Sequence, residues 1–268
     1  YKINGIALFN KIDDINVISK IIRVLDNAYY ITKKPLITNI EYDILVEFIK
    51  NKYGDKIQIG YKNNVLKVNK EVLPYYMASM DKIKPDTKAL KNWKNKYSGN
   101  NIVSGKVDGI SALYSTENGK GCLYTRGNGK IGRNISYFIP YLNLPYIKDI
   151  TLRGEIIMRK DIFQKKYMNK FATIRNLVGG IINGKTINKE IMKDIDFICY
   201  EVIRPILKPS DQIEWLNNNY NGNIIINKVL GNNNLDNNEL SKILKKWRNS
   251  YEYEIDGIII NNDKIYER

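Results

Sequence analysis

Apolar residues change their spacing part-way along the chain, and this change restricts the folds that the sequence can adopt. From Ile15 to Tyr30 they recur at the spacing of an amphipathic helix. Beginning near Ile102 they form short runs separated by turn residues, which is typical of β-strands. We therefore expect a small helical domain over residues 1–66, followed by an α+β domain, mostly antiparallel, over residues 67–268.

A second helix is predicted in the helical domain by its end signals. After the break at Pro35, Thr38 can cap a helix, and Glu41, three residues later, completes a capping box. Gly54 supplies a C-terminal stop. The apolar face of this helix would consist of Ile40, Ile44, Leu45, Phe48 and Ile49.

The β-rich part begins with a predicted hairpin. The runs 112–115 and 122–125 flank Asn118-Gly119, and this pair favours a tight turn because both residues tolerate positive φ. Further apolar runs predict buried strands over residues 151–158, 197–203 and 257–260. Helical patterns lie over residues 161–169 and 238–251, so we expect antiparallel sheets flanked by helices.

The absence of histidine limits the chemistry that is open to the chain. It excludes catalytic arrangements that depend on imidazole, such as serine and cysteine triads. With only Cys122 and Cys199, neither a disulfide framework nor a cysteine-rich zinc site is available. Catalysis must therefore use Lys, Asp, Glu, Arg or a metal ion. No apolar run is long enough to span a membrane, and we expect an intracellular location without a membrane partner.

The charge of the chain indicates a polyanionic partner. Its net charge of +15 comes from 43 basic and 28 acidic side chains, and the basic ones are spread along the sequence. Nucleic acid is the simplest such partner, because each phosphate contact releases condensed counterions. A basic surface that reflects the composition of an AT-rich genome is the alternative.

Two segments combine basic residues with glycine. Lys106 leaves a strand-like run, with Asp108 two positions on and Gly109 permitting a tight turn. Such a lysine can act as a nucleophile once it loses its proton, although a surface turn can have the same sequence. The segment TRGNGKIG, residues 125–132, places Arg126 among glycines that let the backbone approach a phosphate. An irregular turn is the alternative reading of this segment.

Two further charged segments lie within or beside apolar runs. Arg153 and Glu155 fall inside the run 151–158, where an unpaired charge would be costly to bury. They form either a structural ion pair or a site that faces a cleft. Glu254 and Asp256 enter the run 257–260, where they could help to hold a divalent cation or simply cap a strand.

Five residues follow the order and spacing of the motifs of covalent nucleotidyltransferases: Lys106, Arg126, Glu155, Tyr200 and Asp256. The pattern resembles DNA ligases most. The TRGNG loop, the LRGEI strand and the segment FATIRN, residues 171–176, resemble the NAD-dependent branch. Tyr29, Tyr30 and the segment PLITNIEYD, residues 35–43, resemble the N-terminal module of those ligases. The segment KVDGISALY, residues 106–114, resembles the corresponding sequence of ligases from large DNA viruses.

The resemblance implies a fold and an activity. The fold would be a helical domain that binds the nicotinamide mononucleotide (NMN) half of NAD, followed by a nucleotidyltransferase domain, ATP-grasp-like, of antiparallel sheets flanked by helices. Lys106 would attack the α-phosphate of NAD, release NMN and keep AMP, as the first step in sealing nicks. NAD and Mg²⁺ would be required, nicked double-stranded DNA would be the partner, and the chain would be a monomer.

The resemblance also assigns roles to single residues. The catalytic set would be Lys106, Asp108, Arg126, Glu155 and Asp256. The nucleotide-binding set would be Tyr29, Tyr42, Asp43, Ser79, Met80, Lys106, Gly109, Arg126, Glu155, Arg175 and Tyr200. Within these sets Glu155 would contact the nucleotide ribose, Tyr200 would stack on adenine and Arg175 would stabilise the charge on the phosphates. Tyr42 and Asp43 would contact the nicotinamide half, and no residue is assigned as a metal ligand.

Five positions depart from the pattern of bacterial ligases. Ser104 stands in place of a glutamate, Asn183 of an arginine, Asn261 of a lysine, Tyr30 of a histidine and Asn39 of an aspartate. Two alternatives therefore stay open: a ligase or capping-type transferase that uses ATP or GTP, and a decayed ligase that only binds nucleic acid. The chain also ends before the next motif of the family, so we expect poor nick sealing by this chain alone.

Overall fold

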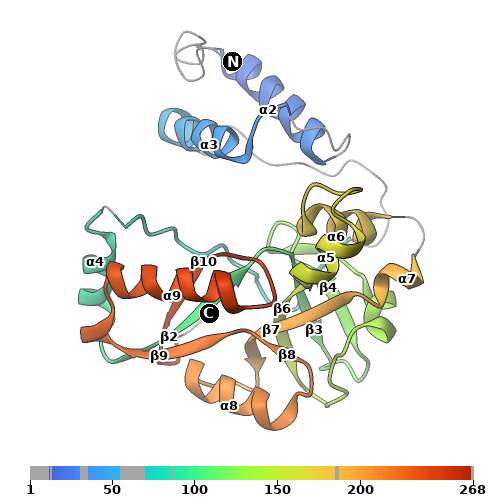
Figure 1. Ribbon diagram of the computed structural model, residues 1–268, viewed down its shortest axis with the longest axis vertical. Helices are drawn as coiled ribbons and strands as arrows, with labels where there is room; N and C mark the ends of the chain where they lie inside the picture. The colour runs from blue at the N-terminus through green and yellow to red at the C-terminus, as the bar shows by residue number, and fades with distance from the viewer. Residues whose placement is uncertain are drawn as a thin grey trace. The chain divides into compact units, whose positions relative to one another are not determined.

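The computed structural model describes residues 12, 14–30, 36–54, 70–85, 87–184 and 187–266, without the side chains of residues 27, 29, 30, 39 and 40. The chain divides into two compact units, Tyr1–Lys67 and Val68–Arg268. Figure 1 shows helices α2 and α3 in the first unit and the sheets with their covering helices in the second. Each unit is described by itself below.

The first unit contains both helices that the sequence predicts, α2 (Ile15–Tyr30) and α3 (Asn39–Tyr53). The capping box is confirmed: the Glu41 N–H donates to Thr38 Oγ1 at 3.2 Å, and the Thr38 N–H donates to Glu41 Oε2 at 2.7 Å. Gly54 ends α3 with a φ of 58°. The helices share a small core of fully buried side chains, namely Ile18, Ile22, Leu45 and Ile49. Ile44 was predicted on the buried face but is 43% exposed.

The second unit contains two larger sheets, in agreement with the predicted α+β class. A three-stranded sheet has the order β10-β2-β9, and both pairings are antiparallel. A five-stranded sheet has the order β4-β3-β6-β7-β8, antiparallel except for the pair β7-β8. The strands of the first are β2 (Asn100–Val107), β9 (Asn227–Gly231) and β10 (Ile255–Asn262). Those of the second are β3 (Ile110–Ser115), β4 (Cys122–Thr125), β6 (Thr151–Met158), β7 (Ile195–Arg204) and β8 (Asn223–Ile224).

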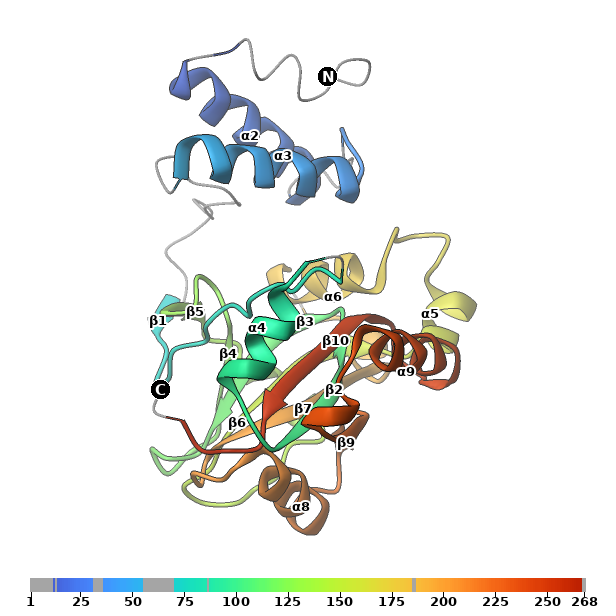
Figure 2. The ribbon, with the colours of Figure 1, turned by 90° about the vertical axis from the view of Figure 1, so that its left-hand side faces the viewer.

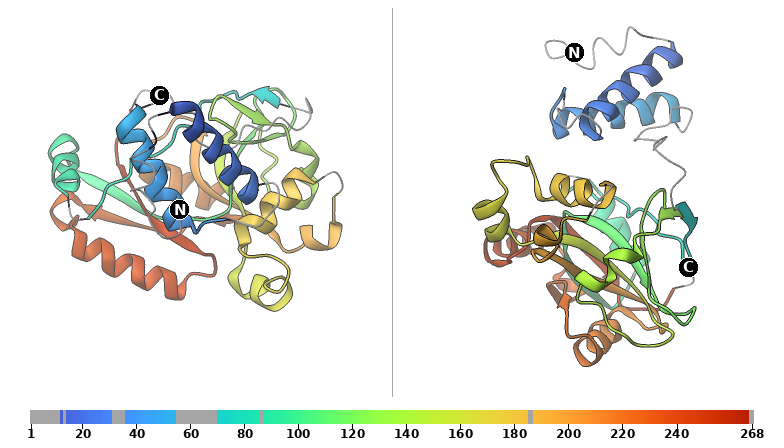
Figure 3. Two further views of the ribbon diagram at one scale, coloured as in Figure 1. Left: turned by 90° about the horizontal axis from the view of Figure 1, so that it is seen from above. Right: turned by 90° about the vertical axis from the view of Figure 1, so that its right-hand side faces the viewer.

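Helices flank these sheets. They are α4 (Ala89–Lys96), α5 (Lys160–Lys166), α6 (Ile174–Asn183), α7 (Lys189–Met192), α8 (Pro209–Asn219) and α9 (Asn237–Ser250), with short 3-10 turns η2 (Ser136–Tyr141) and η3 (Asn232–Asn234). The predicted helices 161–169 and 238–251 correspond to α5 and α9. In Figure 2, α9 lies beside β10 of the three-stranded sheet, on which it packs. Figures 1 and 3 show α6 and α8 at opposite ends of the unit, where α6 packs on β6 and α8 on β7.

The hairpin β3-β4 is only partly as predicted. Its strands pair antiparallel, with Ala112 opposite Thr125 and Ser115 opposite Cys122. Gly119 has a φ of 76°, and its N–H donates to the Thr116 carbonyl at 3.0 Å. Asn118 does not adopt positive φ, contrary to the expected tight turn. The reason is the length of the connection, because residues 116–121 form a longer loop that needs only one left-handed residue.

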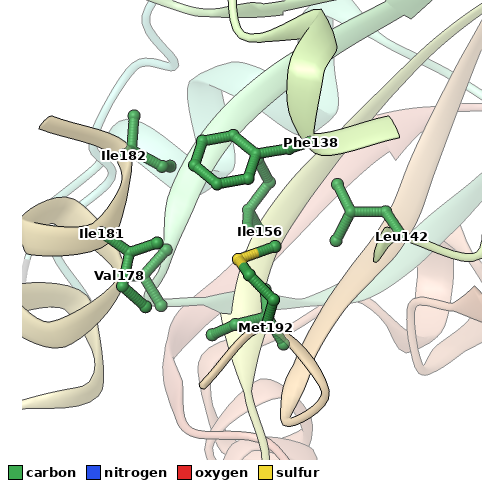
Figure 4. Close-up of a pocket in the computed structure, with 8 residues that line it drawn as sticks. Phe138, Leu142, Ile156, Val178, Ile181, Ile182 and Met192 are labelled. Carbon is green, nitrogen blue, oxygen red and sulfur yellow. The ribbon is translucent and has the colours of Figure 1, made fainter. Parts of the chain in front are cut away.

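The core of the second unit lies against β6 and β7. β6 is buried along nearly its whole length, because other elements cover both of its faces. Figure 4 shows apolar side chains packed near this strand, where Phe138, Ile156 and Val178 are among the residues that line a void of about 10 Å³. A void of this size has room for roughly one water molecule, and its wall is apolar. It is therefore a feature of packing and is too small to bind a ligand.

A third, two-stranded pairing connects the start of the second unit to the glycine-rich loop. β1 (Lys70–Val72) pairs antiparallel with β5 (Ile131–Arg133). The Leu73 N–H donates to the Lys130 carbonyl and the Met77 N–H to the Gly129 carbonyl, each at 2.9 Å. Gly129 has a φ of 92°, and a Cβ there would lie 2.9 Å from the Met77 carbonyl oxygen. The segment 70–77 therefore follows the loop closely.

Candidate active site

Lys106 lies at the end of β2, opposite an irregularity in β10. In the register of these strands Ile255 faces Val107 and Gly257 faces Lys106, so Asp256 is an extra residue in a β-bulge. A bulge redirects the side chain of its extra residue. Here Asp256 Oδ2 lies 2.5 Å from Lys106 Nζ, and both side chains are about half exposed. The predicted nucleophile and the predicted carboxylate thus form an ion pair.

The charges around Asp256 determine its ionisation. Partial burial opposes ionisation of its carboxyl group, but the hydrogen bond and charge of Lys106, helped by Lys82 and Arg248, outweigh burial and lower its pKa. Arg248 also fixes the backbone of the bulge. Its Nε donates to the Ile255 carbonyl at 3.1 Å and its Nη2 to the Asp256 carbonyl at 2.8 Å. Asp256 is therefore held as an anion in a defined position.

Arg175 joins the turn after β2 to helix α6. Its Nη1 donates to Asp108 Oδ1 at 3.0 Å and to the Gly109 carbonyl at 2.9 Å. Arg175 sits in the first turn of α6, which Thr173 caps by accepting from the Asn176 N–H at 3.1 Å. Gly109 is required here because a Cβ would lie 2.3 Å from the Ile156 carbonyl oxygen. The close approach brings this turn against β6.

Glu155 lies on β6 and is only 5% exposed. Its Oε1 accepts from the Gly109 N–H at 3.2 Å, and its Oε2 accepts from Ser111 Oγ at 2.9 Å. Burial raises the pKa of Glu155 to about 7, although the Ser111 hydrogen bond, the Arg175 charge and the Gly109 N–H all act to lower it. Near neutral pH this carboxyl group is therefore close to half-protonated.

Tyr200 is the extra residue of another bulge, in β7. Arg153 faces Glu201 and Gly154 faces Cys199, which leaves Tyr200 without a partner on β6. Burial raises its pKa above the ordinary value, and the neighbouring charge of Glu155 raises it further. Arg153 lies 6.0 Å from the centre of the Tyr200 ring.

Arg153 and Glu155 have different roles, although both belong to one charged segment of β6. Arg153 Nη1 lies 2.9 Å from Glu201 Oε2, so Arg153 forms a structural ion pair with Glu201 and not with Glu155, its expected partner. Glu155 has no such partner in the salt bridges of the described residues and sits among Gly109, Ser111 and Tyr200 instead. For Glu155 the alternative of a site that faces a cleft stays a prediction.

Arg126 is held against the segment that precedes β2. Its Nε donates to the Met77 carbonyl at 3.0 Å and its Nη2 to Ser79 Oγ at 2.6 Å. Its backbone N–H donates to the Ser111 carbonyl at 3.0 Å. Met80, the neighbour of Ser79, has a half-exposed side chain. The structure thus brings Arg126 and Ser79 together, as a shared nucleotide site requires.

These contacts join most of the predicted residues of the second unit. Asp108, Gly109, Arg175 and Glu155 form one connected group, and Lys106 with Asp256 forms a neighbouring pair. A pocket of about 360 Å³ opens beside them, lined by Asp108, Lys160, Arg248, Glu254, Ile255 and Asp256. Sequence reasoning missed Ser111 and Arg248. Ser111 lies two positions beyond Gly109, and the alternation of a strand places it on the same face as Gly109, which is the signal that could have found it.

In the helical unit the structure describes the side chains of two predicted residues, Tyr42 and Asp43. Tyr42 donates its hydroxyl to Asp26 Oδ1 at 2.6 Å, and Asp26 is 2% exposed. Sequence reasoning missed Asp26. Asp43 is exposed on α3. The side chains of Tyr29, Tyr30 and Asn39 lie outside the described residues.

Three of the residues that depart from the bacterial pattern, Ser104, Asn261 and Asn183, are described by the structure. Ser104 is buried on β2. Asn261 is exposed on β10 and lies opposite Ile102, away from the end of the strand that carries Lys106. Asn183 donates to the Gly179 carbonyl of its own helix at 2.8 Å. Within the residues that the structure describes, no three His, Cys, Asp or Glu side chains gather to hold a metal ion. The described helices include none that is long and apolar enough to cross a membrane.

Comparison with known proteins identifies the family. Residues 68–268 match the sequence profile of the NAD-dependent DNA ligase adenylation domain. The chain belongs to this family. Its adenylation domain contains the connected group around Glu155 and the Lys106–Asp256 pair described above.

Viral and bacterial ligases are similar to the chain over nearly its full length. The DNA ligase of Acanthamoeba polyphaga mimivirus is 36% identical, and the match covers 94% of the chain and 40% of that ligase. The putative DNA ligase 205R of Invertebrate iridescent virus 6 is 34% identical over 91% of the chain and 40% of its own length. The DNA ligase of Borreliella burgdorferi strain ZS7 is 29% identical over 91% and 41%. The chain therefore spans about two fifths of these relatives.

Solved structures are similar to the chain only in a general way. A protein titled Pmar-Lig_Pre has a TM-score of 0.46 and 15% identity, with 87% of the chain and 49% of that protein covered. The ligase domain from M. tuberculosis LigD has a TM-score of 0.38 and 15% identity, with 63% and 50% covered. The family assignment rests on the sequence match and draws nothing from these two structures.

Proposed function

We propose that the chain transfers AMP from NAD to its own Lys106 and releases NMN. The observation that carries this proposal is the pairing of Lys106 with Asp256 in a domain of the NAD-dependent ligase family. Lys106 Nζ forms a bond to the α-phosphorus of NAD, and the bond from that phosphorus to the bridging oxygen breaks. NMN leaves with the electron pair of the broken bond.

The lysine must first lose a proton. A free lysine has a pKa of about 10.4 and is protonated at neutral pH. Asp256 is the carboxylate within hydrogen-bond distance of Lys106 Nζ, so it orients the amine and is the acceptor within reach for its proton. Arg126 and Arg175 would stabilise the charge that develops on the phosphates.

The group around Glu155 suits the adenosine half of the substrate. In its ionised form Glu155 can accept a hydrogen bond from a ribose hydroxyl, and the donors Gly109 and Ser111 orient it for this purpose. Tyr200 lies beside Glu155 and offers an aromatic face for adenine. In the helical unit, Tyr42 and Asp43 would contact the NMN half of NAD.

Mg²⁺ would enter with the phosphates of the substrate. The described residues supply no cluster of three ligands, and Mg²⁺ commonly binds through one or two carboxylates together with substrate phosphates. Such an ion would neutralise phosphate charge during the transfer. Nicked double-stranded DNA would be the later substrate, in keeping with the names of the relatives and with the net charge of +15. Nothing in the proposed chemistry requires more than a monomer in an intracellular setting.

Intact-mass analysis tests this proposal. The purified chain is incubated with Mg²⁺ and either NAD or ATP, beside the variants Lys106→Ala and Lys228→Ala. Lys228 is a matched control because it lies on β9 of the same sheet and pairs with Glu239 at 3.2 Å. We expect the mass of AMP to be added with NAD only, to wild type and Lys228→Ala but not to Lys106→Ala. An adduct from ATP would favour the ATP-dependent alternative, and no adduct from either donor would favour a decayed ligase.

A further inference from the structure

Ser111 stands where three residues of the candidate site meet. Its hydroxyl donates to Glu155 Oε2 at 2.9 Å, and Ser111 and Glu155 are direct partners in the β3-β6 ladder. Its carbonyl accepts from the Arg126 N–H at 3.0 Å. Its side chain also acts to lower the pKa of the neighbouring Tyr200 hydroxyl, against the stronger effect of burial. One side chain and its backbone thus connect the ribose, adenine and phosphate parts of the proposed site.

Ser111 is one of the two donors that orient the Glu155 carboxylate, and it also favours ionisation of that group. The Gly109 N–H donates to Oε1 and the Ser111 hydroxyl donates to Oε2, so together they fix the plane of the carboxylate. The charged neighbours are Arg175 from α6, which favours ionisation, and Asp108 from the turn after β2, which opposes it. Among the groups that favour ionisation of Glu155, the Ser111 hydroxyl has the largest influence. Removing it would loosen the carboxylate and shift its charge.

We propose that Ser111 is a positioning residue for AMP transfer, because its hydroxyl holds the Glu155 carboxylate in the orientation and charge state that receive the ribose. The proposal rests on the proposed function and adds to it a residue that none of the motifs assigned a role. Ser111 acts through Glu155 and need not touch the reacting atoms. The backbone contact with Arg126 does not depend on the hydroxyl, so a change of side chain leaves that contact in place.

Three variants separate this role from general structure. Ser111→Ala removes the hydroxyl, and Ser111→Thr keeps it. Ser115→Ala is the matched control, because Ser115 lies on the same face of β3 and its hydroxyl also contacts a glutamate, Glu117, at 3.4 Å. Ser115 also accepts from Thr151 Oγ1 at 2.8 Å, and among the described residues its hydroxyl makes no hydrogen bond to the candidate site.

Titration of Glu155 is the first measurement. In protein labelled with ¹³C at the glutamate carboxyl carbon, the Glu155 signal is assigned by its loss in Glu155→Gln and followed by NMR from pH 5 to 9. We expect a wild-type midpoint near 7, a midpoint about half a pH unit or more higher in Ser111→Ala, and wild-type behaviour in Ser111→Thr and Ser115→Ala. An unchanged midpoint in Ser111→Ala would overturn the proposal.

The rate of AMP transfer over the same pH range is the second measurement. By intact mass with NAD, Ser111→Ala should be about tenfold slower at pH 7 and should recover part of that loss as pH rises, because Glu155 then ionises again. If the Glu155 midpoint moves but the rate equals that of wild type at every pH, Ser111 does not position Glu155 for transfer. A wild-type chain that never forms an adduct contradicts the proposed function instead, and the titration still decides whether Ser111 sets the charge of Glu155.

Discussion

The two sheets of the adenylation domain each bring one carboxylate to the candidate site, and they treat it in opposite ways. The five-stranded sheet buries Glu155 to 5% exposure among uncharged donors, and burial raises its pKa to about 7. The three-stranded sheet places Asp256 in an exposed bulge, where Lys106 outweighs partial burial and lowers its pKa. The comparison shows that depth in the fold and the nearest charge, rather than the carboxyl group itself, decide which form is present.

The largest contrast between the sheets should appear when a methyl group is added beside each carboxylate. In Gly154→Ala the new Cβ would lie 2.4 Å from the Ile198 carbonyl oxygen and 2.4 Å from the Phe197 ring. We expect a loss of about 3 kcal/mol in the free energy of unfolding. In Gly257→Ala the new Cβ would lie 4.0 Å from its nearest neighbour, Lys106 Cδ, and we expect the free energy of unfolding to change by no more than about 0.5 kcal/mol.

Urea unfolding followed by tryptophan fluorescence measures this contrast. All three tryptophans of the chain, Trp93, Trp215 and Trp247, belong to the second unit, so the signal reports on the two sheets. Equal losses for the two alanine variants would contradict the view that the five-stranded sheet is the tightly packed one.

The pH dependence of stability should have opposite signs for the two carboxylates. Folding raises the pKa of Glu155 from an ordinary 4.5 to about 7, so the native state binds more protons than the unfolded state between these values. Stability from this group is therefore lost as pH rises from about 4.5 to about 7, by on the order of 3 kcal/mol. From about pH 4.5 to about pH 7, the free energy of unfolding of wild type should fall relative to that of Glu155→Gln. Above this pH range the difference between the two proteins should stay constant.

Asp256 gives the reverse case. Its folded pKa is lowered, so its contribution is present above its ordinary value of 3.8 and is lost as pH falls through the folded pKa. The difference in free energy of unfolding between wild type and Asp256→Asn should therefore stay constant from pH 5 to 8 and change only at acid pH. Urea unfolding at several pH values measures the free energy of unfolding over both pH ranges. If the difference between Asp256→Asn and wild type changed near neutral pH, the two carboxylates would not differ as stated.

Asp256→Asn should affect activity far more than stability. The ion pair with Lys106 is exposed, and such pairs contribute about 1 kcal/mol or less to folding. Loss of the carboxylate removes the acceptor nearest to the nucleophile, and we expect AMP transfer from NAD to slow by about 100-fold. Intact-mass time courses give the rate, with the exposed pair Lys208–Asp211 as a control through Asp211→Asn. A rate within threefold of wild type would show that Asp256 is dispensable.

Arg175→Gln should have a small effect on stability, and it tests the link between the sheets. Arg175 binds Asp108, which follows β2, and its charge also favours ionisation of Glu155 on β6. Without that charge the midpoint of Glu155 should rise, while the free energy of unfolding should change by less than about 1 kcal/mol because the side chain is partly exposed. The NMR titration of Glu155 measures the shift. Lys193→Gln, which removes an exposed partner of Glu190, should leave the midpoint unchanged.

The parts of the fold that local signals determine could be predicted from the sequence. The bounds of α2 and the capping box at Thr38 follow from periodicity and from side chains within one helical turn. The strand 151–158 follows from a continuous apolar run between turn residues. Helix α6 was overlooked as a helix because its sequence, IRNLVGGIIN, contains two glycines, and packing of its apolar face on β6 outweighs their low helix propensity.

The contacts that build the site could not be predicted in the same way. The resemblance to ligases placed Lys106 and Asp256 in one site, but their pairing depends on a bulge in a strand 150 residues further along the chain. Ser111 was missed because its partner Glu155 lies 44 residues away, and only the register of β3 against β6 makes them neighbours. Asp26 was missed because its partner Tyr42 belongs to the next helix. Long-range register is the information that local patterns lack.

The bulge in β10 also means that the proposed chemistry depends on a single residue that a one-codon deletion would remove. If a lineage deleted the single codon for Asp256, Ile255 and Gly257 could still face Val107 and Lys106, now as consecutive residues of a regular ladder. The deletion would shorten the strand by the one residue that has no partner there. Descendants with that deletion would be expected to fold, but the proposed nucleophile Lys106 would lack the carboxylate that pairs with it here.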